Sequence, residues 1–280
     1  METKEIDGLT LYYDAGEGPA AELIGRACTR SVALIHDLWM LEPPAECRVY
    51  VMTAWLPFLF HSAPWPWRIW IALTLPLRYA RMEKLWGLAG GWAQRYGSRQ
   101  TIGLKPPRLL AAVDAGLRGR IFVERPVEEW VAHNACHELV HAATEPLQLP
   151  AWLHEGLAMV TVDRLAGRPT VQAKTLELLA GREAAARPQA GYGQGGVDEE
   201  GLIYLAVRGY WITRYLAETR PELLRALLGQ RQPHEALEAR LAAELGMDRD
   251  EFWARIDGMV AAHYQENDRT ASEKGESDEQ

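Results

Sequence analysis

The sequence predicts a mostly helical α+β fold with a small N-terminal α/β region and a helical C-terminal part. In the first fifty or so residues, short strand-like runs flank one long amphipathic stretch. After residue 126, nearly every segment instead carries apolar residues at helical spacing. Hydrophobic residues make up 48% of the 280-residue chain, which is enough for a buried core.

The N-terminal region reads as strand, helix and strand. Residues 9–13 alternate as in a short strand. Residues 20–40 have an apolar stripe at helical spacing, and Pro43 follows them as a helix breaker. Residues 48–52 are rich in Val and Tyr and predict a second strand. This order indicates a small α/β unit.

A tryptophan-rich insertion, about residues 53–96, follows the second strand. It holds Trp55, Trp65, Trp67, Trp70, Trp86 and Trp92, more than half of the chain's 11 tryptophans. Its apolar runs are short for a bilayer span. Three interpretations stay open: packing on the core, contact with a membrane interface through residues 55–92, where Trp and basic residues concentrate, and a tilted hairpin in the bilayer.

The segment before the central motif predicts strands at residues 100–104 and 120–123. A helix is then expected over residues 127–144. Pro126 suits a helix start, and the helix dipole favours the two glutamates in the first turn. The helix should end before Pro146.

The central motif is His137-Glu138-Leu139-Val140-His141. Positions i and i+4 of a helix lie on nearly the same face, so both imidazoles can reach one metal ion. Glu138 flanks that position and is placed to act as a general base on a water molecule. The spacing therefore predicts a catalytic metal site.

A second helix, beginning after Pro150, offers a third ligand. Glu155 lies 14 residues after His141, which leaves room for a loop and a return. His154 competes with it, but adjacent helical side chains diverge by about 100°, so only one can face the metal. Gly156 is costly in a helix, and we expect it to allow close approach to the helix that bears the motif.

The stretch HELVH followed by LPAWLHEGLA resembles the gluzincin, or peptidase MA-like, metallopeptidases. The resemblance is specific over residues 129–162. It implies a zincin-like domain that hydrolyses peptide bonds through a zinc-activated water. The sequence departs from the metzincins, with Leu147 where their third His stands. It also departs from thermolysin, because Met159 stands where an Asp follows the Glu ligand.

The resemblance implies a role for five residues. His137, His141 and Glu155 match the Zn²⁺ ligands, and Glu138 matches the catalytic base. Tyr204, on a later helix, matches the position of an oxyanion-stabilising tyrosine in several gluzincins. The alternative function is a non-catalytic, zinc-stabilised binding or regulatory domain, associated with a membrane through the tryptophan-rich insertion.

The C-terminal part predicts helices over residues 202–218, 221–228, 234–245 and 249–262. A glycine-rich segment, residues 191–196, is expected to be a loop because no strand precedes it. The predicted organisation is an N-terminal region over residues 1–125, a metallopeptidase region over 126–265, and an acidic, disordered tail over 266–280.

Composition limits the partners and the compartment. A net charge of −8 gives no reason to expect nucleic acid as a partner. The resemblance to gluzincins implies a peptide or protein substrate. Three sparse cysteines fit a reducing compartment, and the N-terminus lacks the basic and apolar regions of a signal peptide. We therefore expect a cytoplasmic protein, and membrane association through the insertion stays open as one of the three interpretations above. The sequence leaves the oligomeric state open.

Overall fold

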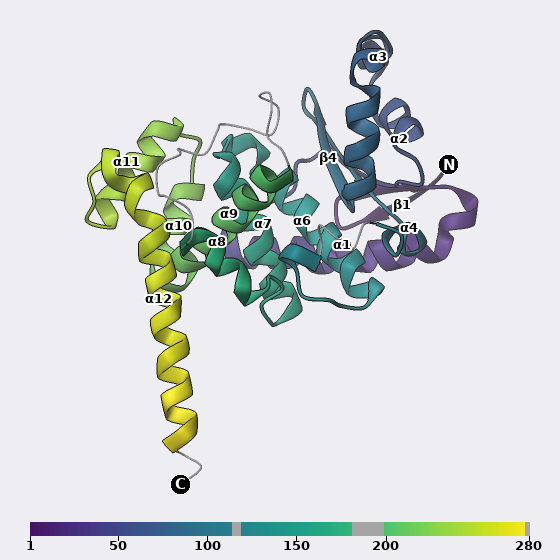
Figure 1. The fold of residues 1–280 in the computed structure, drawn as a ribbon. Helices are drawn as coiled ribbons and strands as arrows, with labels where there is room; N and C mark the ends of the chain where they lie inside the picture. Colours follow the sequence, from purple (N-terminus) through teal and green to yellow (C-terminus); the bar gives the residue numbers. More distant parts are fainter. Residues whose placement is uncertain (114–118, 181–198, 278–280) are drawn as a thin grey trace. The chain divides into compact units, whose positions relative to one another are not determined.

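A computed structural model describes residues 1–113, 119–180 and 199–277 of the chain (Figure 1). It is a mixed α+β structure, mostly helical, with one five-stranded sheet, as the sequence predicted at this coarse level. The chain divides into two compact units. The first contains Met1–Pro146 and Thr161–Thr170, and the second contains Leu147–Val160 and Val171–Gln280. The glycine-rich segment at residues 191–196 lies outside the described residues.

The sheet of the first unit has the strand order β1-β2-β3-β5-β4. Its strands are β1 (Glu2–Ile6), β2 (Leu9–Tyr13), β3 (Cys47–Val51), β4 (Gly91–Tyr96) and β5 (Arg99–Leu104). Strands β2, β3 and β5 run parallel, whereas β1 and β4 are antiparallel to their neighbours. The central strands bury residues such as Val49 and Ile102. Because β4 ends the order, one of its edges has no sheet partner among the described residues.

Two helices carry most of the remaining core of this unit. Helix α1 (Gly18–Trp39) packs against α6 (Val127–Thr144), and α6 also contacts β4 and β5. Ile24 and Ile35 of α1 and Leu139 of α6 are fully buried. The apolar stripe of each helix therefore covers the other, which anchors the motif-bearing helix to the sheet. Short turns η1 (Ala15–Glu17) and α4 (Pro107–Leu110) complete this part.

The tryptophan-rich insertion forms two helices, α2 (Trp55–Ser62) and α3 (Trp65–Leu88), between β3 and β4. Helix α2 packs on the core through Trp55, Phe58 and Leu59. Much of α3 is exposed, including Trp65 and Leu77. Core packing therefore accounts for only part of the insertion. None of the described helices combines the length and the apolar content needed to cross a bilayer.

The second unit is helical. Its described elements are part of α7 (Ala151–Ala166), then η3 (Ala173–Leu176), α8 (Glu177–Ala180), α9 (Glu199–Thr219), α10 (Pro221–Leu228), α11 (His234–Glu244) and α12 (Arg249–Ser277). The turn η2 (Glu145–Leu147) precedes α7. A buried ion pair between Arg208 of α9 and Asp257 of α12 joins two of these helices at 2.8 Å. Both side chains are 2% exposed, so each charge depends on the other.

The compact units of the structure have other bounds than the regions predicted from the sequence. The first unit extends to Pro146 and includes α6, because the core of this unit forms between α6 and α1, which are distant in sequence. The predicted boundary was residue 125. Helix α12 extends into the residues of the predicted acidic tail as far as Ser277.

Three strand assignments also change. Strands β1 and β4 were not predicted, and both are edge strands with polar residues. Each is joined to its neighbour by a two-residue turn, and Asp7-Gly8 has positive φ at both positions, a strong hairpin signal. The predicted strand at residues 120–123 is wrong. It is reduced to the end of a helix and one bridge residue, Phe122.

Candidate metal centre

Helix α6 presents the two motif histidines from a firmly packed position. It begins at Val127 after Pro126 and ends at Thr144, as predicted. Cys136, Leu139 and Val140 are fully buried, and together they hold the motif in place. With these residues fixed in the core, His137 and His141 share another face of the helix.

The two imidazoles lie almost as far apart as two ligands of one metal ion. Their Nε2 atoms are 2.9 Å apart, and the rings are nearly perpendicular at 89°. A tetrahedral zinc ion with Zn–N bonds of about 2.0–2.1 Å separates two ligand nitrogens by roughly 3.3 Å. The pair therefore needs to open by only a few tenths of an ångström to hold such an ion.

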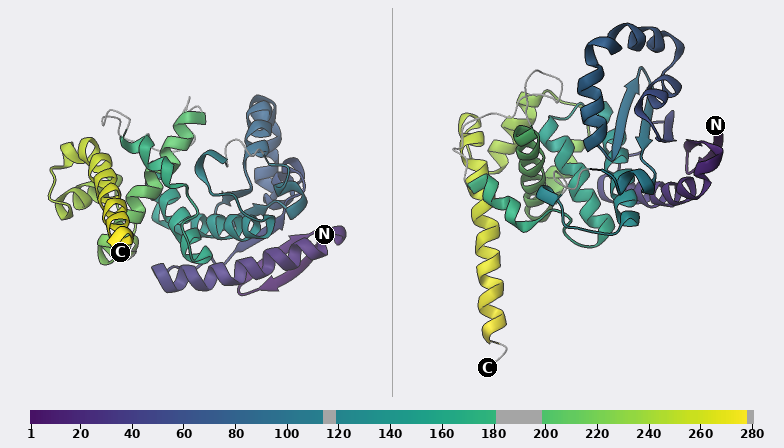
Figure 2. Two further views of the ribbon diagram at one scale, coloured as in Figure 1. Left: turned by 60° about the horizontal axis from the view of Figure 1, so that its bottom comes forward. Right: turned by 45° about the vertical axis from the view of Figure 1, so that its right-hand side comes forward.

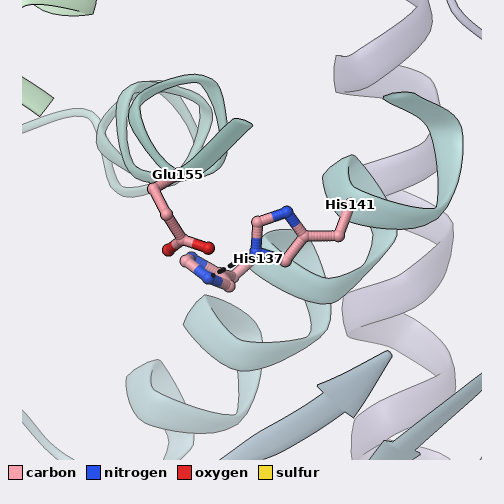
Figure 3. Close-up of side chains that lie close together, drawn as sticks. All are labelled: His137, His141 and Glu155. Carbon is pink, nitrogen blue, oxygen red and sulfur yellow. Dashed lines mark hydrogen bonds between the residues drawn. The ribbon is translucent and has the colours of Figure 1, made fainter. Parts of the chain in front are cut away.

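Glu155 of α7 supplies the third donor of the group. Ligand atoms of His137, His141 and Glu155 all lie within 4.8 Å of one another. Figure 3 shows the Glu155 carboxylate directed towards the imidazoles from its own helix. Among the described residues, this is the group of His, Cys, Asp and Glu side chains that could hold a metal ion, and His154 is not part of it.

The donor set fits zinc. Two imidazole nitrogens and one carboxylate oxygen are a known set of protein ligands for catalytic zinc, and they leave a fourth position open. The histidines and the carboxylate are partly or fully shielded from solvent.

Glu138 lies against the first residue of β4. Its side chain is 9% exposed. A Cβ atom on Gly91 would come to 2.6 Å from Glu138 Cγ and 2.9 Å from Glu138 Oε1. A side chain at position 91 would therefore displace this carboxylate. Sequence analysis did not identify Gly91, although two adjacent glycines before a strand are a signal of close backbone approach.

His133 is a further residue that sequence analysis missed. It lies one helical turn before His137, and the two rings are nearly parallel, with centroids 6.0 Å apart. Arg125 Nη1 lies 3.0 Å from His133 Nδ1. Because a guanidinium only donates, Nδ1 is the acceptor, and the proton of the neutral ring lies on Nε2. The signal in the sequence was the spacing of three histidines at i, i+4 and i+8.

Tyr204 of α9 has a defined partner in the second unit. Its hydroxyl donates to Asp257 Oδ2 at 2.9 Å, while Arg208 Nε donates to Oδ1 of the same carboxylate at 2.8 Å. A tyrosine hydroxyl has a single proton to donate. In this arrangement the proton is directed at Asp257.

Gly156 has a different neighbour from the one that we expected. A Cβ atom at this position would lie 2.1 Å from Thr213 Oγ1 and 2.2 Å from the carbonyl oxygen of Gly209. Both belong to α9. The expectation that Gly156 serves an approach to the motif-bearing helix is therefore corrected, because the glycine makes room for α9.

Comparison with known proteins adds no relative from which a role could be taken. No family model, no curated protein and no solved structure matches the chain.

Proposed function

We propose that this protein is a zinc-dependent metallopeptidase of the gluzincin type, with a zincin-like catalytic domain. The observation that carries the proposal is the group of His137, His141 and Glu155, whose ligand atoms lie within 4.8 Å of one another. Glu138, on the same helix as the two histidines, provides a base beside them. A bound zinc ion would acidify water and polarise the scissile carbonyl.

Glu138 moves the proton in the proposed reaction. Its carboxylate takes a proton from the attacking water and later delivers it to the leaving amine. The side chain is buried and lies against Gly91. Holding the base in this way reduces the cost of orienting it during each reaction cycle.

Strand β4 favours a peptide as the substrate. It is the last strand of the sheet, and it begins at Gly91, which contacts Glu138. An extended peptide can add to such an edge through backbone hydrogen bonds, without a requirement for particular side chains. A peptide that lay along β4 would pass next to the base.

Tyr204 is the candidate donor to the oxyanion, a role that rests on the resemblance alone. To fill it, the hydroxyl must leave Asp257 when substrate binds. Replacing Tyr204 with Phe tests the role. A fall in kcat of about 10²–10³-fold with unchanged zinc content supports it. A change in thermal stability alone assigns the hydroxyl to the Asp257 network.

The substitution Glu138→Gln tests the proposal as a whole. It keeps the size of the side chain and removes the base, so we expect zinc content to stay at the wild-type level. Hydrolysis of a broad peptide library should fall by about 10²–10⁴-fold. Metal analysis and mass spectrometry of the library provide the two measurements. Glu128→Gln is the matched control, because Glu128 is exposed in the first turn of the same helix.

Two outcomes contradict the assignment. If the Glu138→Gln protein cleaves as fast as the wild type, Glu138 is not the base. If the wild type binds zinc but cleaves nothing in the library, the alternative of a zinc-stabilised binding or regulatory domain replaces the peptidase.

A further inference from the structure

Helix α3 carries most of the exposed apolar surface. Of the eleven large hydrophobic residues that are exposed in the described part of the chain, seven belong to this helix, namely Trp65, Trp67, Ile69, Trp70, Leu73, Leu77 and Tyr79. Leu73 is 73% exposed and Leu77 is 89% exposed. Single exposed leucines are common, but seven such residues on one helix indicate a surface that is covered by something.

Four of the seven exposed residues form a strip along the helix, whereas Trp67 packs on Tyr96 and Tyr79 packs on Trp55. Trp65, Ile69, Leu73 and Leu77 follow one another at intervals of four residues, so they lie in one row. On another side of α3, Ile71 is buried, and Leu75, Met82 and Trp86 pack against residues of the sheet and α2. The fold of the first unit thus uses one apolar side of α3 and leaves the other side exposed.

Helix α3 is bent along its length. Pro76 interrupts the helix, and a proline inside a helix bends it. Figure 2 shows α3 curving along its length. Before Pro76, Ile71 is buried and Trp67 packs on Tyr96, whereas the side chains of the row are exposed.

The net charge of α3 is opposite in sign to that of the whole chain. Helix α3 contains four basic residues (Arg68, Arg78, Arg81 and Lys84) and one acidic residue (Glu83), a net charge of +3. The whole chain has a net charge of −8. An apolar strip on a basic helix of an acidic protein is complementary to a surface that is both apolar and anionic.

We propose that the exposed strip of α3 binds the interface of a membrane that contains anionic lipids. Tryptophan is enriched where acyl chains meet headgroups, and basic residues are attracted to anionic headgroups. A helix that lies in this interface buries its apolar side to a shallow depth and does not cross the bilayer. A second copy of the chain fits less well, since it would bring two helices of charge +3 face to face. This inference does not depend on the metallopeptidase proposal.

Vesicle flotation with the full-length protein tests the inference. We expect the wild type to float with vesicles of phosphatidylcholine and phosphatidylglycerol, and less with phosphatidylcholine alone. High salt should weaken binding, because it screens the charge attraction. Leu73→Asp should lower the partition coefficient by about tenfold or more, since it removes a leucine from the buried side and adds a negative charge. Leu73→Phe should keep binding.

Met40→Asp is the matched control. Met40 is 70% exposed, close to the exposure of Leu73, and lies at the end of α1. The substitution makes the same change in charge at an apolar residue away from the strip, so flotation should be unchanged.

Three results overturn the inference. The first is that the wild type stays in the soluble fraction with anionic vesicles. The second is that Leu73→Asp floats as well as the wild type. The third is that Met40→Asp reduces vesicle binding as much as Leu73→Asp does. If light scattering instead shows a wild-type dimer that Leu73→Asp dissociates, with no vesicle binding by either, the strip binds a second copy.

Discussion

The backbone of Gly156 lies against the backbone of Gly209, so that a Cβ atom on Gly156 would be 2.2 Å from the Gly209 carbonyl oxygen. The relationship is mutual, because a Cβ atom on Gly209 would lie 2.2 Å from the carbonyl oxygen of Trp152. Helices α7 and α9 therefore touch through their main chains. Glu155, the candidate third ligand, is the residue next to this contact.

Gly156→Ala should destabilise the protein by about 1–3 kcal/mol, because the atoms that the new methyl group meets belong mostly to the backbone and cannot turn away. Zinc affinity should fall as well, since α7 must shift next to Glu155. Urea unfolding and metal titration measure the two effects. Gly258→Ala is the control. A Cβ atom at Gly258 meets nothing within 4 Å, so this exposed helical position should gain up to about 1 kcal/mol. Equal behaviour of the two variants would contradict the packing argument.

Glu155→Ala should reduce zinc affinity by more than about 100-fold, because it removes one of three protein ligands. His154→Ala should change the affinity little, since His154 lies outside the group of candidate ligands. Competition with a chelator gives both affinities. If the histidine variant loses zinc and the glutamate variant keeps it, the ligand set is wrong.

Gly91→Ala should lower kcat by about 10–100-fold while zinc stays bound. The added methyl group would meet Glu138 Cγ at 2.6 Å and must displace the base, and small displacements of a catalytic group are costly. Gly87→Ala, at a position where a Cβ atom meets nothing within 4 Å, should leave kcat unchanged. Steady-state kinetics and metal analysis measure both effects. A normal kcat in Gly91→Ala would show that the contact does not position Glu138.

The buried thiols of Cys28 and Cys47 should make the protein sensitive to alkali. Burial raises the pKa of each from 9.0 to about 12. Their contribution to stability is complete below pH 9 and is lost as pH rises towards 12, because the unfolded chain releases the protons first. The free energy of unfolding should fall by about 1 kcal/mol per pH unit for each thiol in this range.

Chemical denaturation at several pH values, with the wild type and Cys47→Ala, isolates this effect. The variant loses some packing at every pH, but its decline between pH 9 and 12 should be shallower. The same slope in both proteins would show that Cys47 does not contribute to the alkaline loss.

The sequence by itself determined the helices and the spacing of the candidate ligands. Helices α6 and α10 begin and end where the pattern predicted, because breakers and helical spacing are local signals. His137 and His141 share a face for the same reason, since four residues of helix return the chain to nearly the same direction. Glu155 was singled out by its spacing and by the resemblance.

Only the tertiary structure decided which residues from distant segments meet. The contact of Gly91 with Glu138, the packing of Gly156 on α9 and the hydrogen bond from Tyr204 to Asp257 join residues that no local pattern relates. The apolar periodicity of α3 likewise did not reveal which side of the helix the core would cover. Local periodicity specifies which residues share a face, whereas the neighbour of that face depends on how the whole chain buries its apolar surface.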